Sequence, residues 1–164
     1  MSLIRPATAC DADAVAAIWN PVIRDTAITF NAIEKAADDL TQSFAQKRAD
    51  GHAFLVAEAE GGLLGFATYG QFRGGIGYAH TMEHTIILAP AARGRGVGRA
   101  LMAAIEDHAR ANGAHSIFAG VSAENPAGRA FHAALGYAEV AVLREVGFKF
   151  GRWMDLVLMC KMLS

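Results

Sequence analysis

Apolar residues along the chain follow two patterns, short apolar runs and repeats at helical spacing, and their alternation predicts a mixed α/β domain. The first helix is expected over residues 9–19 or somewhat beyond, with Val15 and Trp19 on its apolar face and Pro21 ending or kinking it. Three further helices are predicted: residues 36–49, a segment that follows a glycine-rich loop and ends at Asn112-Gly113, and a segment from Asn125-Pro126 to Gly136.

Short apolar runs bounded by turn residues predict the strands. These are residues 3–5, 54–57, 64–69, 80–88, 116–121, 137–143 and 153–160, with a turn-rich segment at 147–151 between the last two. Glu60-Gly61-Gly62 is typical of a hairpin turn, and the sheet is expected to be mostly antiparallel. No repeat or linker interrupts the pattern, so residues 1–164 are expected to form a single domain.

The composition is typical of a globular protein, since 53% of the residues are hydrophobic and the net charge is −1. A net charge so close to zero argues against a nucleic-acid partner. Cys10 and Cys160 lie far apart and are expected to stay reduced. The chain starts without a signal-peptide pattern and lacks an apolar run long enough to span a bilayer, so we expect a cytoplasmic protein with no membrane partner.

The strongest local signal is the loop between the strand at 80–88 and the helix that follows it. Glycine alternates there with other residues in the order Arg93-Gly94-Arg95-Gly96-Val97-Gly98-Arg99. Glycine lets a ligand approach the backbone N–H groups, and a helix N-terminus presents unpaired N–H donors at the positive end of its dipole. Because arginines add positive charge, this loop suits a phosphate or pyrophosphate.

Spacing separates the phosphate-binding loops that this segment could form. A P-loop needs a lysine after its glycines, and none follows Gly98. The dinucleotide motif G-x-G-x-x-G comes early in a βαβ unit, whereas this loop follows several strands. Arg93-x-x-Gly96-x-Gly98 matches the R/Q-x-x-G-x-G/A acetyl-CoA loop of the GNAT superfamily of N-acetyltransferases, which the chain resembles. A glycine-rich connection that binds no ligand is the alternative.

Four further segments resemble the branch of that superfamily that acetylates phosphinothricin and methionine sulfoximine. They are Glu83 to Leu88, Asn125 to Ala127, His132 to Tyr137 and Val146 to Asp155. The resemblance extends from Ile4 to about Lys161 and implies the GNAT fold. In that fold a mostly antiparallel, twisted sheet splays at the cofactor site and is flanked by about four helices.

The resemblance also implies which residues bind acetyl-CoA. The loop is expected to hold the pyrophosphate, while the backbone of the preceding strand and one asparagine contact the pantetheine arm. The complete set is Ile86, Ile87, Leu88, Arg93, Gly94, Arg95, Gly96, Val97, Gly98, Arg99 and Asn125. For Asn125 the alternative is an N-cap of the helix that starts at Pro126, and the two roles are compatible.

Two residues are candidates for proton transfer. Acyl transfer to an amine needs a neutral amine, and Glu83 matches the position of the base proposed in similar proteins. His132 takes the position at which many superfamily members have a tyrosine acid, and a histidine can protonate a departing thiolate. The alternatives are a solvent-facing strand glutamate and a histidine packed on its helix.

The candidate substrate-binding residues are Phe30, Arg73, Tyr78, Glu83 and Thr85. Arg73 suits an amino-acid carboxylate because a guanidinium matches a carboxylate bidentately, although an ordinary surface arginine is the alternative. Tyr78-Ala79 departs from a methionine-sulfoximine-type relative, which has an arginine after the aromatic residue. His80, Glu83 and His84 complete no metal-ligand set, so no metal is expected.

The sequence therefore predicts an acetyl-CoA-dependent N-acetyltransferase. Its expected acceptor is the amino group of a small amino-acid analogue of the phosphinothricin, methionine sulfoximine or methionine sulfone type. The alternatives are the same chemistry on another small amine or a protein N-terminus, and a non-catalytic acyl-CoA-binding module. Because the resembled proteins are homodimers, the resemblance implies a homodimer with residues 147–155 at the interface, and an internal turn packed on its own sheet is the alternative for that segment.

Overall fold

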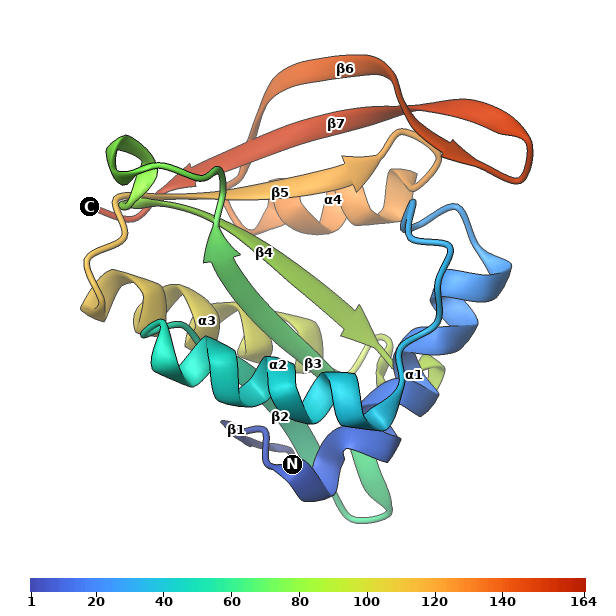
Figure 1. The fold of residues 1–164 in the computed structure, drawn as a ribbon, viewed down its shortest axis with the longest axis vertical. Coiled ribbons are helices and arrows are strands. Elements are labelled where there is room, and N and C mark those ends of the chain that lie inside the picture. The colour runs from blue at the N-terminus through green and yellow to red at the C-terminus, as the bar shows by residue number, and fades with distance from the viewer.

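The computed structural model describes residues 1–164, and its centre is a seven-stranded sheet in the order β1-β2-β3-β4-β5-β7-β6 (Figure 1). The strands are β1 (Leu3–Pro6), β2 (Phe54–Ala59), β3 (Gly62–Gln71), β4 (Thr81–Leu88), β5 (Ser116–Ser122), β6 (Ala138–Lys149) and β7 (Arg152–Met162). All neighbouring strands are antiparallel except β4 and β5. The predicted mixed α/β fold with a mostly antiparallel sheet is confirmed.

Four helices flank the sheet: α1 (Ala12–Asp25), α2 (Ala37–Ala49), α3 (Val97–Ala111) and α4 (Pro126–Ala134). The larger apolar core lies under α3 and α4, where Leu101 and Ile105 are fully buried. The smaller core lies under α1 and α2 and contains Val15 and Phe44. The two helix pairs therefore cover opposite faces of the sheet, each through an apolar stripe. None of the helices has the length and apolar character that crossing a membrane requires.

The sheet opens between its two parallel strands. β4 and β5 pair only from Thr81 opposite Ser116 to His84 opposite Ala119, although both strands continue further. They diverge beyond this point, as Figure 1 shows. The backbone of β4 from Thr85 onward therefore has no strand partner on the β5 side, and each unpaired N–H or C=O needs a partner from elsewhere.

Alternation along β4 sends successive side chains to opposite faces. Met82 and Ile86 pack in the core under α3, and Ile87 packs in the core under α1. Glu83 and Thr85 share the face of Ile87, whereas His84 shares the face of Met82. At the opening, β4 thus presents polar side chains on both faces of the sheet.

α1 continues past Pro21 to Asp25, within the predicted extension of this helix, and Ile23 in the turn after the proline is completely buried. One predicted boundary is wrong. The segment at 147–151 is mostly strand rather than turn, since β6 runs to Lys149 and β7 begins at Arg152. A register shift between Leu143 and Gly147 lets β6 continue past its irregular centre.

Candidate active site

Two cavities lie where β4 and β5 diverge, and they share a wall. The Glu83 cavity measures about 240 Å³ and is lined by Glu83, Thr85, Phe30 and parts of α1, β5 and β7. The loop groove measures about 580 Å³ and follows the glycine–arginine loop and α4. The residues that line both are Ile28, Ile86, Ile87, Asn125 and His132. The two cavities therefore adjoin at these five residues, and a ligand bound in the groove can contact a ligand bound in the cavity there.

Local backbone geometry and packing explain why glycine occurs at three positions of the loop. Gly94 and Gly96 have φ values of 72° and 76°, in the left-handed region that glycine tolerates best. A Cβ on Gly98 would lie 3.1 Å from the ring of Phe131, so glycine allows α3 to pack closely on α4. α3 begins at Val97, and its N-cap residue offers no side-chain hydrogen bond. Its first N–H groups are thus available to an anion, as the sequence predicts.

Ten of the eleven predicted cofactor-binding residues line the loop groove. They are Ile86, Ile87, Leu88, Arg93, Gly94, Gly96, Val97, Gly98, Arg99 and Asn125. Arg95 does not line it and instead directs its guanidinium to the carbonyl oxygen of Ala91, at 3.4 Å. Asn125 caps α4 through Oδ1, which accepts a hydrogen bond from the Gly128 N–H at 3.0 Å. Its Nδ2 has no protein partner, so the capping role leaves a donor at the shared wall.

Glu83 is half-buried in its cavity, and its carboxylate has no hydrogen-bond or ion-pair partner in the protein. A Cβ on Gly120 would lie 3.1 Å from Glu83 Oε2, so the glycine on β5 leaves room for the carboxylate. Burial raises the pKa of Glu83 above its ordinary range, because desolvation disfavours the charged form. An unpaired carboxylate of this kind is suited to accept a proton from a ligand in the cavity.

Two stacked histidines lie beside the shared wall. The rings of His84 and His132 are 5.0 Å apart at 27°, and Tyr137 packs against both at a steep angle. His132 Nδ1 lies 2.8 Å from the carbonyl oxygen of Gly128, which can only accept, so Nδ1 carries the proton. Both nitrogens of His84 and Nε2 of His132 are buried without a partner.

These histidines are neutral at physiological pH. Burial and the neighbouring His132 lower the pKa of His84 to about 3, and burial also lowers the pKa of His132. Nε2 of neutral His132 is then a hydrogen-bond acceptor rather than a donor. His84 was not among the site residues predicted from the sequence, where the available signal was a histidine between Met82 and Ile86 on the apolar face of its strand.

The structure brings only part of the predicted substrate set together. Phe30 and Thr85 line the Glu83 cavity, as does Glu83 itself. Arg73 and Tyr78 line neither cavity. They lie exposed in the segment between β3 and β4, with the Arg73 guanidinium 5.7 Å from the centre of the Tyr78 ring. No group of three or more His, Cys, Asp or Glu side chains is arranged to hold a metal ion.

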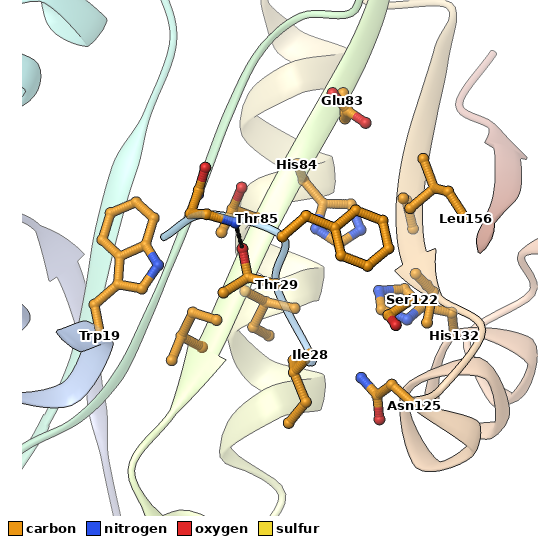
Figure 2. Close-up of a pocket in the computed structure, with 17 residues that line it drawn as sticks. Trp19, Ile28, Thr29, Glu83, His84, Thr85, Ser122, Asn125, His132 and Leu156 are labelled. Atoms are coloured by element: carbon orange, nitrogen blue, oxygen red, sulfur yellow. Dashed lines mark hydrogen bonds between the residues drawn. The ribbon is translucent and has the colours of Figure 1, made fainter. Parts of the chain in front are cut away.

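Trp19, Thr29 and Ser122 also line the cavity and were not predicted as site residues from the sequence. Figure 2 shows Glu83, His84 and Thr85 in succession along β4, with Ser122 and Asn125 on the side of β5 and Trp19 on the side of α1. Thr29, from the segment after α1, lies between them. These residues come from separate elements, and only the folded chain brings them together.

Comparison with known proteins places the chain in a family. The family model described as "Acetyltransferase (GNAT) family" matches residues 19–137, and the chain therefore belongs to this family. It is 36% identical to the L-amino acid N-acyltransferase MnaT of Escherichia coli over 95% of this chain and 91% of that protein. It is 35% identical to the L-methionine sulfoximine/L-methionine sulfone acetyltransferase of Salmonella typhimurium, with the same coverage. The predicted branch and enzyme class are confirmed: the chain is a GNAT N-acetyltransferase.

Two solved structures support the same assignment. A phosphinothricin acetyltransferase from Sinorhizobium meliloti, in complex with acetyl-CoA, has a TM-score of 0.93 at 27% identity, covering 99% of this chain and 89% of that one. A ribosomal-protein-alanine N-acetyltransferase from Brucella melitensis has a TM-score of 0.93 at 39% identity, covering 98% of this chain and 99% of that one. The predicted GNAT fold is confirmed.

Proposed function

We propose that the protein transfers the acetyl group of acetyl-CoA to the α-amino group of a small amino acid or amino-acid analogue. The observation that carries the proposal is the shared wall: a loop groove suited to an anion lies on one side, and the unpaired, half-buried Glu83 carboxylate lies on the other. Relatives that act on methionine sulfoximine, methionine sulfone or phosphinothricin support this acceptor class. The small volume of the Glu83 cavity, about 240 Å³, also favours a small acceptor.

The residues of the chain suggest how the reaction proceeds. The N–H groups at the start of α3, with Arg93 and Arg99, hold the pyrophosphate of acetyl-CoA. The free backbone of β4 from Thr85 to Leu88 directs the pantetheine arm toward the shared wall. Acetyl-CoA supplies the thioester, and the acceptor amine lies in the Glu83 cavity.

Glu83 supplies the proton transfer that the amine needs. An aliphatic ammonium must lose a proton before it can attack a thioester, and Glu83 takes this proton directly or through a water molecule. The neutral nitrogen attacks the thioester carbon and loses its second proton to solvent as the amide bond forms. The carbon–sulfur bond breaks, and the thiolate leaves with the electron pair. Nε2 of His132 is an acceptor, so the thiolate takes its proton from solvent.

Thiol release tests the proposal directly. We expect turnover of acetyl-CoA with methionine sulfoximine, methionine sulfone or phosphinothricin, and mass spectrometry should detect the N-acetyl product. A short peptide with N-terminal alanine tests the second candidate, which the Brucella structure favours. Peptide turnover without amino-acid turnover would replace the preferred acceptor, and acetyl-CoA binding without any turnover would favour a binding module.

We also propose that the protein is a homodimer through the β6–β7 hairpin. Large apolar side chains stand exposed along it, namely Val140, Val142, Val146, Phe148 and Trp153. An exposed apolar patch of this kind is typical of an interaction site, and a second copy offers the same patch. Sedimentation velocity should give the mass of two chains, and a monomer at micromolar concentration would contradict the proposal.

A further inference from the structure

Gly147 and Lys149 of β6 contact a loop that lines the Glu83 cavity from the side away from the cavity. Alternation along β6 sends Val146 and Phe148 to solvent and Gly147 and Lys149 toward residues 26–31, which we call the acceptor loop. Ile28, Thr29, Phe30 and Asn31 of this loop line the cavity. The hairpin therefore contacts the cavity through a loop that is more than 110 residues away in the sequence.

Lys149 makes the most specific of these contacts. Its Nζ donates to the carbonyl oxygen of Thr26 at 2.7 Å and to that of Thr29 at 2.9 Å. Lys149 is only 4% exposed, and no carboxylate lies within ion-pair distance of it. Burial lowers the pKa of Lys149, yet the ammonium still gains two carbonyl acceptors in compensation.

The acceptor loop has few other bonds to hold it. Its remaining hydrogen bonds are local: Thr26 Oγ1 to the Val22 carbonyl, the Ile28 N–H to Thr26 Oγ1, and the Asn31 N–H to Thr29 Oγ1. The two bonds from Lys149 are therefore the hydrogen bonds that join residues 26–31 to a distant part of the chain. A segment with so few bonds becomes mobile when its main anchor is removed.

Gly147 provides the second contact. A Cβ on Gly147 would lie 2.6 Å from Cγ and Cε2 of Phe30, closer than any real Cβ contact. Phe30 thus packs directly on the backbone of β6. Glycine at position 147 gives the aromatic ring its place in the cavity wall.

We propose that Lys149 is a positioning residue for the acceptor, which holds the acceptor loop over the Glu83 cavity, with Gly147 giving Phe30 its place. This inference rests on the proposed function, because it assigns the cavity to the acceptor. It also gives a physical reason for Gly147 and Lys149 in the G-F-K-F-G-R-W segment. The geometry of the turn between β6 and β7 does not by itself require these two residues. Of the acceptor loop only Ile28 also lines the loop groove, and the glycine–arginine loop that holds the anion makes no contact with Lys149, so acetyl-CoA binding should depend little on Lys149.

Lys149→Met tests the positioning role, with Lys47→Met as the matched control. Lys47 also donates to a backbone carbonyl, that of Tyr69 at 2.9 Å, and burial also lowers its pKa, but it lines neither cavity. For Lys149→Met we expect the acceptor KM to rise about tenfold while the acetyl-CoA Kd stays within about twofold. Lys149→Arg should recover part of the loss, and Lys47→Met should keep the KM of the wild type.

Hydrogen exchange separates this inference from the proposed function, because it needs no substrate. Lys149→Met should exchange the amides of residues 26–31 faster, with α2 unchanged. Unchanged exchange, or an acceptor KM equal to that of Lys47→Met, would overturn the inference even if the wild type is an active enzyme. If Lys149→Met does not fold, Gly147→Ala decides: a raised acceptor KM supports the inference, and a KM equal to that of the wild type overturns it.

Discussion

The loop groove and the Glu83 cavity adjoin, but the chain builds them in different ways. Most of the groove comes from one continuous segment, the end of β4, the glycine–arginine loop and the start of α3, with α4 closing it. The cavity takes residues from α1, the acceptor loop, β4, β5 and β7. If the proposed function holds, the cofactor site thus comes mostly from local sequence, whereas the acceptor site comes from distant segments that meet only in the folded chain.

Glu83→Gln is the substitution expected to separate the two regions most. The amide keeps the size of the side chain but cannot accept the amine proton, so kcat/KM should fall about 10²- to 10⁴-fold. The acetyl-CoA Kd, measured by calorimetry, should stay within about twofold because Glu83 does not line the loop groove.

Glu60→Gln is the matched control, because this exposed glutamate lies in the turn before β3 and should keep full activity. Equal turnover of both variants would remove Glu83 from the mechanism. A loss of acetyl-CoA affinity in Glu83→Gln would show that the two regions are coupled more strongly than their linings indicate.

The sequence predicted the groove well because its chemistry is local. The alternation of glycines, the helix start and the strand before it are all neighbours in the chain, and ten of the eleven predicted residues line the groove. Arg95 is the exception, since the αL glycines on both sides of it turn its side chain back toward Ala91. Spacing alone does not reveal that direction.

The sequence predicted the cavity only in part. Glu83, Thr85 and Phe30 were selected, but the long segment between β3 and β4 keeps Arg73 and Tyr78 away from the cavity. Trp19 and Ser122 had no local signal. Gly147 and Lys149 were assigned to a turn-rich segment, but in the structure both contact the acceptor loop. The periodicity within β6 cannot reveal a contact with so distant a segment.

A pair of arginine substitutions sharpens this contrast within the glycine–arginine loop. Arg93→Gln should weaken acetyl-CoA binding about tenfold, since a charge-assisted bond to phosphate is lost in the groove. Arg95→Gln should change the Kd by less than about twofold, because Arg95 does not line the groove.

Calorimetric titrations at two salt concentrations measure both effects. The salt dependence of the Kd should become weaker for Arg93→Gln only, because a screened charge has been removed. Equal losses of acetyl-CoA affinity in both variants would mean that both arginines contact the cofactor, as the sequence motif predicts. They would contradict the orientation of Arg95 away from the groove.

The smallest effect concerns Glu83 and His84, neighbours on β4 that face opposite sides of the sheet. Burial raises the pKa of Glu83 from its ordinary value near 4.5, so the folded protein binds more protons than the unfolded chain above that pH. Glu83 therefore lowers the free energy of unfolding as the pH rises. His84 acts in the opposite direction: with its pKa lowered to about 3, the folded protein binds fewer protons between pH 3 and 6.5, and stability falls as the pH falls through this range.

Urea unfolding at pH 5 and pH 7.5 distinguishes the two contributions. Glu83→Gln should be more stable than the wild type at pH 7.5 and should lose that advantage on acidification. His84→Gln should lose less stability than the wild type between pH 7.5 and pH 5, because the unfolded chain no longer takes up a proton there. A gain for Glu83→Gln that is the same at both pH values would mean that the carboxylate is not desolvated. The cavity would then lack the property that distinguishes it from the solvent-exposed, positively charged groove beside it.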